Sequence, residues 1–390
     1  MSKRIGSAAA GGPRHERMRE RFPVLSTRTY LNSCSCGALA TDVAAAVRQY
    51  LDERTEKGSD WVYWAGRYEA VRAAVAALLG AGEDEIAVTA SASAGINAIA
   101  SSMDFSGPRN KVVISDFEFP TNAQIWYAQE RRGAIVHRVP ERDGAIALEQ
   151  FAAAIDEQTL IVAVTHVCYR NGVKLDIARI AEIARQKGAM LLVDAYQSLG
   201  TCDFDVRRMG ADFVVGGMVK YLLGTSGIGF LYVRRELVNA LVPTVTGWFA
   251  QDDIMAMDIT GYRPAGNARR FEAGTPPVMN CYAALAGLGV LAEYGLEFIE
   301  RRIAELTSSI VAAASDAGYA LATPKDPAQR GALVALRTHD EEALVGLLGE
   351  RGIVTSSRSG NLRISPHFYN QPEDVDTLMR ELARHRHLLV

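Results

Sequence analysis

Residues 190–197 read MLLVDAYQ, an apolar run that ends on Asp194. Residues 213–220 read FVVGGMVK, so a second apolar run is followed closely by Lys220. Strands that are apolar on both faces are typical of a parallel sheet covered by helices on both sides. The carboxyl ends of such strands lie at one edge of the sheet, where active-site groups collect. The two runs therefore predict an α/β fold that brings an acid and an amine to one site.

The same alternation extends toward the N-terminus. Further short apolar runs occupy residues 85–89, 111–114, 134–136 and 160–164. Apolar residues at spacings of three and four, which are typical of helices, occupy residues 94–100, 121–131, 148–155 and 177–186. Alternating strands and helices predict a large domain with a mainly parallel sheet.

The pattern changes after Pro277, where a long helical region reaches to about Gly318. Shorter strand patterns follow at residues 331–336 and 361–364. Because single cores stop growing near about 250–300 residues, a chain of this length is expected to form two domains. We predict a flexible tail (1–20), a large domain (21–280) and a small C-terminal α/β domain (281–390). An alternative is that the N-terminal segment of the large domain packs on the small domain.

Composition excludes several classes of protein. The chain has 390 residues, a formal net charge of -3 and 22% charged residues, so it offers no basic surface to nucleic acid or anionic lipid. Its apolar runs are of strand length, and residues 1–20 lack the continuous apolar core of a secretory signal. Five cysteines without a zinc-type pair of CxxC motifs indicate reduced thiols, no metal and a cytoplasmic protein. A small molecule is the predicted partner.

Lys220 and Asp194 have the chemistry needed to hold pyridoxal 5′-phosphate (PLP). A lysine amine in an apolar setting loses its proton readily and can form a Schiff base with an aldehyde. A carboxylate can hold the protonated pyridine nitrogen and keep the ring an electron sink. Gln197, three residues after Asp194, is a candidate to reach the phenolic oxygen of PLP, and the alternative is an ordinary loop amide. The alternatives are a surface lysine that closes a loop and an aspartate that caps the next turn.

Residues 91–95 read SASAG between a predicted strand and a predicted helix. Backbone N–H groups and hydroxyls at a helix N-terminus favour an anion such as a phosphate, although a simple serine N-cap explains the same residues. Phe119 ends another strand, where its ring can stack on a pyridine or pack in the core.

These motifs in this order resemble the class V aminotransferase group of fold-type I PLP enzymes. The group includes cysteine desulfurases, selenocysteine lyases, kynureninases and isopenicillin-N-epimerase-like proteins. The resemblance runs from YLNS at residues 30–33 to LRISPHFYN at residues 362–370. It implies a seven-stranded sheet, a catalytic Schiff-base lysine at Lys220, a pyridine-nitrogen partner at Asp194 and Gln197 beside the phenolic oxygen. It also places the Ala92 backbone and Ser93 in the phosphate-binding turn.

Two further segments bear on the cofactor. FPTN at residues 119–122 resembles the kynureninase version, which implies that Phe119 stacks on the ring and that Asn122 lies near the cofactor. GTPP at residues 274–277 resembles the segment whose threonine, here Thr275, reaches the phosphate of the neighbouring subunit. This implies a homodimer with active sites at the interface. A Gly-Pro turn that caps the following helix is the alternative.

The resemblance also identifies candidate substrate-binding residues. Arg363 matches the arginine that binds the substrate carboxylate, for which a planar guanidinium is well suited; a surface arginine is the alternative. The loop NSCSCG at residues 32–37 matches one that borders the substrate and contributes Ser33. Its thiols, Cys34 and Cys36, either touch the substrate or pack the turn. Arg170 is a candidate second anion site or a structural ion pair.

Departures from the family pattern narrow the reaction. Residues 355–363 contain no cysteine, which argues against a persulfide-forming desulfurase, and Gly217 and Val219 replace a serine and a histidine of many relatives. We predict a PLP-dependent enzyme that acts at the α-carbon of an amino acid, as a C–S lyase on an S-substituted cysteine or a related biosynthetic amino acid. The alternatives are an aminotransferase, an epimerase, or a catalytically silent PLP-fold partner protein. An intact set of Lys220, Asp194 and Arg363 argues against the last.

Overall fold

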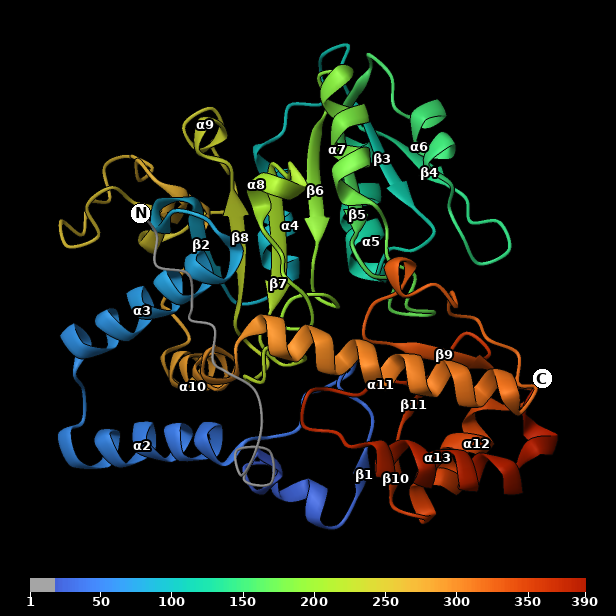
Figure 1. Ribbon diagram of the computed structural model, residues 1–390. Coiled ribbons are helices and arrows are strands. Elements are labelled where there is room, and N and C mark those ends of the chain that lie inside the picture. The colour runs from blue at the N-terminus through green and yellow to red at the C-terminus, as the bar shows by residue number, and fades with distance from the viewer. Residues whose placement is uncertain (1–17) are drawn as a thin grey trace.

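A seven-stranded sheet forms the centre of the computed structural model, which describes residues 18–390 (Figure 1). The strand order is β2-β8-β7-β6-β5-β3-β4, and β8 runs antiparallel to both β2 and β7 whereas the other neighbours are parallel. The strands are β2 (Ile86–Thr89), β3 (Lys111–Ser115), β4 (Ile135–Val139), β5 (Thr159–Thr165), β6 (Met190–Asp194), β7 (Phe213–Gly217) and β8 (Gly229–Val233). The predicted α/β fold with a mainly parallel sheet is confirmed.

Helices cover both faces of this sheet, as the apolar strands require. In β6, Leu191 and Val193 pack in one hydrophobic cluster and Leu192 packs in another, because successive side chains point to opposite faces. The helices of the large domain are α2 (Thr41–Lys57), α3 (Trp61–Leu79), α4 (Ala92–Ser102), α5 (Pro120–Ala128), α6 (Leu148–Ala154), α7 (Ile177–Gln186), α8 (Val206–Met209) and α9 (Arg235–Val238). Side chains of α3 and α7 lie in the first cluster, and those of α4 and α5 lie in the second.

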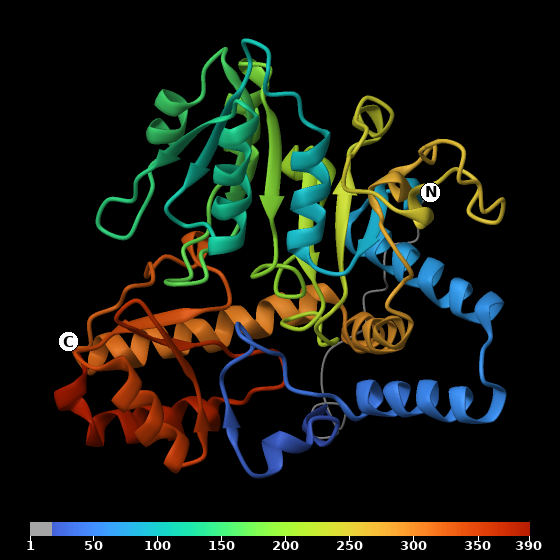
Figure 2. The same ribbon diagram turned by 180° about the vertical axis from the view of Figure 1, so that it is seen from behind.

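The C-terminal part has a separate core around a three-stranded antiparallel sheet of order β11-β12-β9. Its elements are α11 (Leu296–Asp316), β9 (Val334–Arg337), α12 (Glu341–Glu350), β10 (Ile353–Val354), β11 (Ser356–Arg358), β12 (Asn361–Ile364) and α13 (Pro372–Arg384). The preceding helix α10 (Val278–Tyr294) contributes buried side chains to the core of the large domain. Short 3₁₀ helices occur at Pro23–Ser26, Glu83–Glu85, Gln129–Arg132, Trp248–Ala250, Ala268–Phe271, Pro327–Gln329 and Arg386–Leu388. Figure 2 shows this part lying below the carboxyl ends of the central strands.

The N-terminal segment connects the two parts. Its strand β1 (Thr29–Tyr30) pairs in parallel with β10, and the following loop reaches the end of β7, where the Gly37 N–H donates to the Val219 carbonyl over 2.8 Å. A Cβ atom on Gly37 would overlap the carbonyl oxygen of Lys220, so this close approach requires glycine. Of the predicted tail at residues 1–20, residues 1–17 lie outside the described part of the chain.

Within residues 18–390, no single helix is long and apolar enough to cross a membrane. Helices α10 and α11 pass that test of length and composition only as a pair, and they meet at an angle of 81°. The five cysteines are free thiols, of which Cys36 is exposed and Cys34 is buried.

Candidate active site

The ends of β6 and β7 bring together the predicted acid and amine. Asp194 is the last residue of β6 and pairs in register with Val215 of β7, and Lys220 follows β7 in a short loop. Burial lowers the pKa of the Lys220 amine, and this effect outweighs the charge of Asp194, which raises it. In the described chain, the Lys220 Nζ atom has no hydrogen bond or ion pair. A buried amine with a lowered pKa is suited to act as a base or a nucleophile.

Two aromatic rings lie beside the amine. The Lys220 Nζ atom is 4.3 Å from the ring centroid of Tyr196 and 5.7 Å from that of Phe119. Phe119 precedes α5, is 44% exposed, and contacts the ring of Tyr169 edge-on at 5.1 Å between centroids. Its ring is therefore open to a planar ligand in front of the lysine.

Asp194 has one clear hydrogen bond and an environment that favours a cationic partner. Its Oδ1 atom accepts from the backbone N–H of Tyr196 over 2.9 Å. Burial raises the pKa of the Asp194 carboxyl, whereas the Tyr196 N–H and the charge of Lys220 lower it. A protonated ring nitrogen would supply the opposite charge that a buried carboxylate needs.

Gln197 and Arg363 both present buried polar atoms without a partner. The Gln197 Nε2 atom donates to the Cys34 carbonyl over 3.0 Å, and its Oε1 atom has no partner among the described residues. The guanidinium of Arg363 donates to the Tyr169 carbonyl, the Ser356 hydroxyl and the Ser35 hydroxyl over 2.9 to 3.0 Å. Its Nε atom is buried without a partner in the same part of the chain. Unsatisfied buried groups of this kind indicate a place for a polar ligand.

The two interpretations of the serine-rich turn apply to different residues. Ser91 is the N-cap of α4, because its hydroxyl accepts from the Ala94 N–H over 3.1 Å. Ala92 and Ser93 are then the first two residues of the helix, and the Ser93 hydroxyl lies 3.4 Å from that of Thr121. The first turn of α4 thus presents N–H groups and a hydroxyl suited to a phosphate.

Two other predicted residues, Asn122 and Ser33, have their polar groups engaged in the protein. The Asn122 amide is fully buried, donates to Glu118 over 2.7 Å and accepts from Trp126 over 2.9 Å. Through these bonds Asn122 stabilises the turn that carries Phe119. The Ser33 hydroxyl is buried 2.8 Å from the hydroxyl of Tyr369, so it joins the N-terminal loop to the C-terminal part.

Arg170 and Thr275 lie in different surroundings. Arg170 forms an ion pair with Glu141 at 2.8 Å and donates to the Asp116 carbonyl, which corresponds to the structural alternative considered for it. Thr275 is exposed just before α10, so its side chain is available to a neighbouring molecule.

Sequence reasoning assigned no role to the residues that hold Arg363. Ser356 lies directly opposite Arg363 in the pairing of β11 with β12, and Ser35 comes from the N-terminal loop. The register depends on the turn at Ser359 and Gly360, which both have positive φ. The Ser-Gly pair between two short segments was the available sequence signal for this hairpin.

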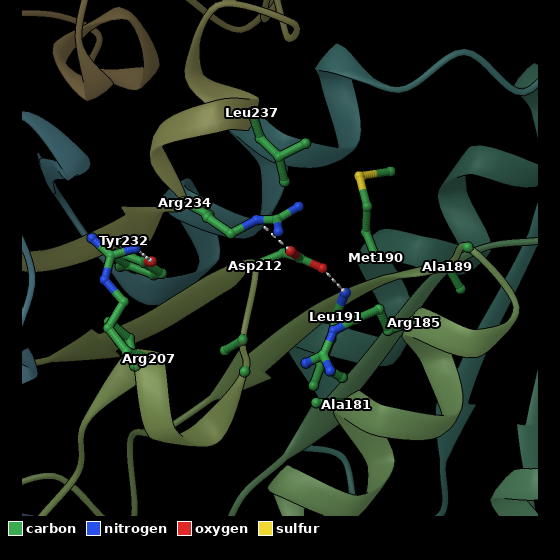
Figure 3. A pocket seen from close by; sticks show the side chains of 14 residues that line it. Ala181, Arg185, Ala189, Met190, Leu191, Arg207, Asp212, Tyr232, Arg234 and Leu237 are labelled. Carbon is green, nitrogen blue, oxygen red and sulfur yellow. Dashed lines mark hydrogen bonds and ion pairs between the residues drawn. The ribbon is translucent and has the colours of Figure 1, made fainter.

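A separate cavity of about 450 Å³ lies at the other end of the central strands, away from Asp194 and Lys220. Figure 3 shows its lining, which includes residues at the start of β6 and at the end of β8. Asp212 in its wall binds Arg234 at 2.9 Å and the Leu191 N–H at 2.8 Å, and Arg207 donates to the Tyr232 hydroxyl. It contains none of the predicted site residues.

The residues at the ends of β6 and β7 fit PLP by their chemistry. Asp194 suits the pyridine nitrogen, the α4 N-terminus suits the phosphate, and Lys220 suits the aldehyde. Unpartnered atoms of Gln197 and Arg363 remain for the phenolic oxygen and for a substrate carboxylate. The fit rests on these orphaned buried groups and on the donors of the helix turn.

Comparisons with known proteins agree with this fit. The sequence profile described as "Aminotransferase class-V" matches residues 29–378. The chain is 37% identical over 370 residues to a Bacillus subtilis (strain 168) protein described as "uncharacterized aminotransferase YcbU", a match that covers 94% of this chain and 97% of that protein. Relatives described as kynureninase and as probable cysteine desulfurase also match over most of the chain.

Solved structures share the fold. A cysteine desulfurase from Thermococcus onnurineus NA1 has a TM-score of 0.87 at 24% identity, and the match covers 97% of this chain and 99% of that one. The cystine C-S lyase C-DES has a TM-score of 0.86 at 22% identity, with coverage of 93% and 99%. At these identities the structural comparisons establish the architecture alone.

Proposed function

The chain belongs to the aminotransferase class-V family and is a PLP-dependent enzyme, and we propose that it is a C–S lyase that acts on an S-substituted cysteine or a related amino acid. When bound, PLP supplies an electron sink for the α-carbon of an amino acid. An amine with a lowered pKa at Lys220 and a guanidinium at Arg363 without a carboxylate partner in the described chain support chemistry at the α-carbon of an amino acid. The observation that favours the lyase is the absence of a thiol from the loop at residues 355–363.

Each residue has a defined task in this proposal. The Lys220 amine, whose pKa burial lowers, removes the α-proton of the substrate. Arg363 binds the α-carboxylate and so fixes which bond of the α-carbon faces the electron sink. Asp194 keeps the opposite end of the ring protonated.

The proposed net reaction is an elimination followed by hydrolysis. The α-proton moves to Lys220, the bond between the β-carbon and sulfur breaks, and the sulfur leaves with the electron pair as a thiol after protonation. Water then releases the remaining carbon skeleton as pyruvate and its nitrogen as ammonia. One S-substituted cysteine and one water thus give one thiol, one pyruvate and one ammonia, with no external oxidant.

The loop at residues 355–363 supports elimination over desulfuration. Its sequence is TSSRSGNLR, so it offers hydroxyls and no thiol to attack a substrate sulfur. One of these hydroxyls, that of Ser356, is 2.9 Å from Arg363 and helps to hold the guanidinium. The loop therefore supports carboxylate binding.

Transamination is the second candidate, because the 37% identical relative is described as an aminotransferase. It would use the same three residues and would return the proton to the cofactor. Epimerisation would return it to the other face of the α-carbon. A catalytically silent partner protein would have no use for a buried amine with a lowered pKa.

Product analysis separates these candidates. The PLP-loaded enzyme is incubated with S-substituted cysteines without any keto acid, and thiol, pyruvate and ammonia are measured. Equal amounts of the three products, absent in Lys220→Ala, would support elimination. Turnover that requires a keto acid and releases no ammonia would replace the proposal with transamination, and change of chirality alone would replace it with epimerisation.

We further propose a homodimer with active sites at the interface. Thr275 is exposed. Exposed apolar side chains also occur at the start of α3, where Val62 is 89% exposed, and in the loop between the 3₁₀ helices Trp248–Ala250 and Ala268–Phe271, where Ile259 is 97% exposed. Such side chains suit a protein partner. Light scattering should give twice the chain mass, and Val62→Asp should shift it toward the monomer. A monomeric wild-type protein would contradict the dimer.

The cytoplasm remains the predicted compartment. Five free thiols suit a reducing environment. Fractionation of cells with an antibody against the protein tests this prediction, and recovery in a secreted fraction would contradict it.

A further inference from the structure

Tyr196 occupies the space in which a side chain of Gly217 would lie. Gly217 is the last residue of β7, and a Cβ atom there would come within 2.7 Å of the Tyr196 Cε2 atom and closer still to its hydroxyl oxygen. Tyr196 itself follows β6 and is anchored by its N–H bond to Asp194. The phenol therefore reaches from the end of β6 across to the end of β7.

The phenol lies on the face of the sheet that α4 covers. Gly217 and Val215 point to the same face, because side chains of a strand alternate with a period of two. Val215 contacts α4, since a Cβ atom on Gly95 would lie 3.1 Å from its Cγ1 atom. The Tyr196 hydroxyl is therefore on the side of the sheet where α4 lies.

The neighbouring strand places the hydroxyl at the N-terminal end of α4. Gly217 pairs with Gly229 in the antiparallel pair of β7 and β8, so their side-chain directions coincide. A Cβ atom on Gly229 would lie 3.1 Å from the backbone nitrogen of Ala92, the first residue of α4. The hydroxyl and the first N–H groups of the helix thus share one end of one face.

We propose that Tyr196 is a cofactor-binding residue whose hydroxyl donates a hydrogen bond to the phosphate of PLP, beside the first turn of α4. Gly217 has no side chain with which to bind the phosphate, and its missing side chain makes room for the phenol. A hydroxyl from the end of β6 thereby replaces a donor at the end of β7.

The state of the phenol suits a donor. Burial raises the pKa of Tyr196 to about 12, so the hydroxyl keeps its proton at neutral pH. Within residues 18–390 this hydroxyl has no hydrogen-bond partner in the protein. Its ring also lies 4.3 Å from the Lys220 Nζ atom, so stacking on the cofactor ring is the competing role.

The inference rests on the family's cofactor and not on the proposed substrate, so its test contains no substrate. PLP and pyridoxal, which lacks the phosphate, are titrated separately into the cofactor-free forms of the wild-type and Tyr196→Phe proteins. Tryptophan fluorescence gives each dissociation constant, and circular dichroism confirms folding. The phenylalanine keeps the ring and its packing on Gly217, so only the hydroxyl is removed.

A donor to the phosphate predicts a selective loss. The dissociation constant of PLP should rise about 10- to 100-fold, as expected for one hydrogen bond to a charged group, and that of pyridoxal should not change. The ³¹P resonance of the bound phosphate should also shift in the variant. Tyr127→Phe, an exposed tyrosine on α5, is the matched control and should leave both constants unchanged.

Two results would overturn the inference. One is unchanged PLP binding in Tyr196→Phe, and the other is an equal loss for PLP and pyridoxal, which would assign the residue to ring packing. A second variant adds independent evidence: Gly217→Ser in the Tyr196→Ala background returns a hydroxyl to the same space and should recover part of the preference for PLP over pyridoxal. Failure of that swap to exceed Tyr196→Ala alone would count against the inference.

Discussion

Replacement of Arg363 by lysine tests whether this residue selects the substrate by its carboxylate. The guanidinium has five N–H donors, of which three bind the Tyr169 carbonyl and the hydroxyls of Ser35 and Ser356. Two donors, including the buried Nε–H, are left for a ligand. A lysine keeps the positive charge but has three donors on one atom, so it cannot both replace these contacts and bind a carboxylate with two parallel bonds.

The expected loss is that of at least one charge-assisted hydrogen bond. Such a bond contributes about 1.5–3 kcal/mol, so the dissociation constant of an S-substituted cysteine should rise about 10- to 100-fold. The matching amine without a carboxylate should bind the wild-type and Arg363→Lys enzymes equally. Both constants are measured from the change in the visible spectrum of the PLP-loaded enzyme.

The control is Arg358→Lys, because Arg358 is an exposed arginine on the strand that pairs with that of Arg363. It should leave both ligands unaffected. Equal weakening of the amino acid and the amine in Arg363→Lys would refute the reasoning, because it would mean that the variant disturbs the whole site. Unchanged binding of both would refute it too, because the carboxylate would then be bound elsewhere.

Three further predictions concern the stability of the fold around the site. Gly37→Ala forces a Cβ atom against the Lys220 carbonyl, so it should lower the free energy of unfolding by about 1–3 kcal/mol in urea titrations; an unchanged midpoint would contradict this. Arg72→Met leaves the carboxylate of Glu272 buried without its partner at 2.6 Å and should cost about 3–5 kcal/mol in the same assay, with partial recovery in a double variant that also carries Glu272→Gln. Burial lowers the pKa of His166 to about 3 from its ordinary 6.5, so the stability it contributes is present above pH 6.5 and is lost as the pH falls toward 3. In that window His166 should make the free energy of unfolding of the wild-type protein fall by about 1.4 kcal/mol per pH unit, and His166→Phe should not show this fall. Parallel pH profiles of the two proteins would contradict this.

The central elements of the fold were predictable because each carries a local pattern. Helix α7 has the predicted bounds, and β6 ends on Asp194 as the apolar run that begins at Met190 predicts. The pattern of β8 (Gly229–Val233) was not identified, although it is a short apolar run of the same kind. Its antiparallel pairing with two neighbours depends on contacts between distant parts of the chain, which periodicity does not reveal.

The candidate site was predictable where it depends on the ends of strands, and less so where it depends on partners. Lys220 and Asp194 lie together because their strands are neighbours in the sheet. The engagement of Ser33 with Tyr369 could not be anticipated, because its partner comes from a distant part of the chain. The role inferred for Tyr196 depends on the missing side chain of a residue in the next strand, which no local motif shows.

The choice of reaction depends on how the two parts of the chain meet. Lys220 and Asp194 belong to the central sheet, whereas Arg363 belongs to β12 of the C-terminal sheet. The N-terminal loop joins them, since Ser35 binds the guanidinium and Gly37 binds the backbone next to Lys220. A shift of this loop would move the carboxylate relative to the amine and change which bond of the α-carbon aligns with the electron sink. Substitutions in residues 33–38 should therefore alter the ratio of elimination to transamination more than they alter cofactor binding.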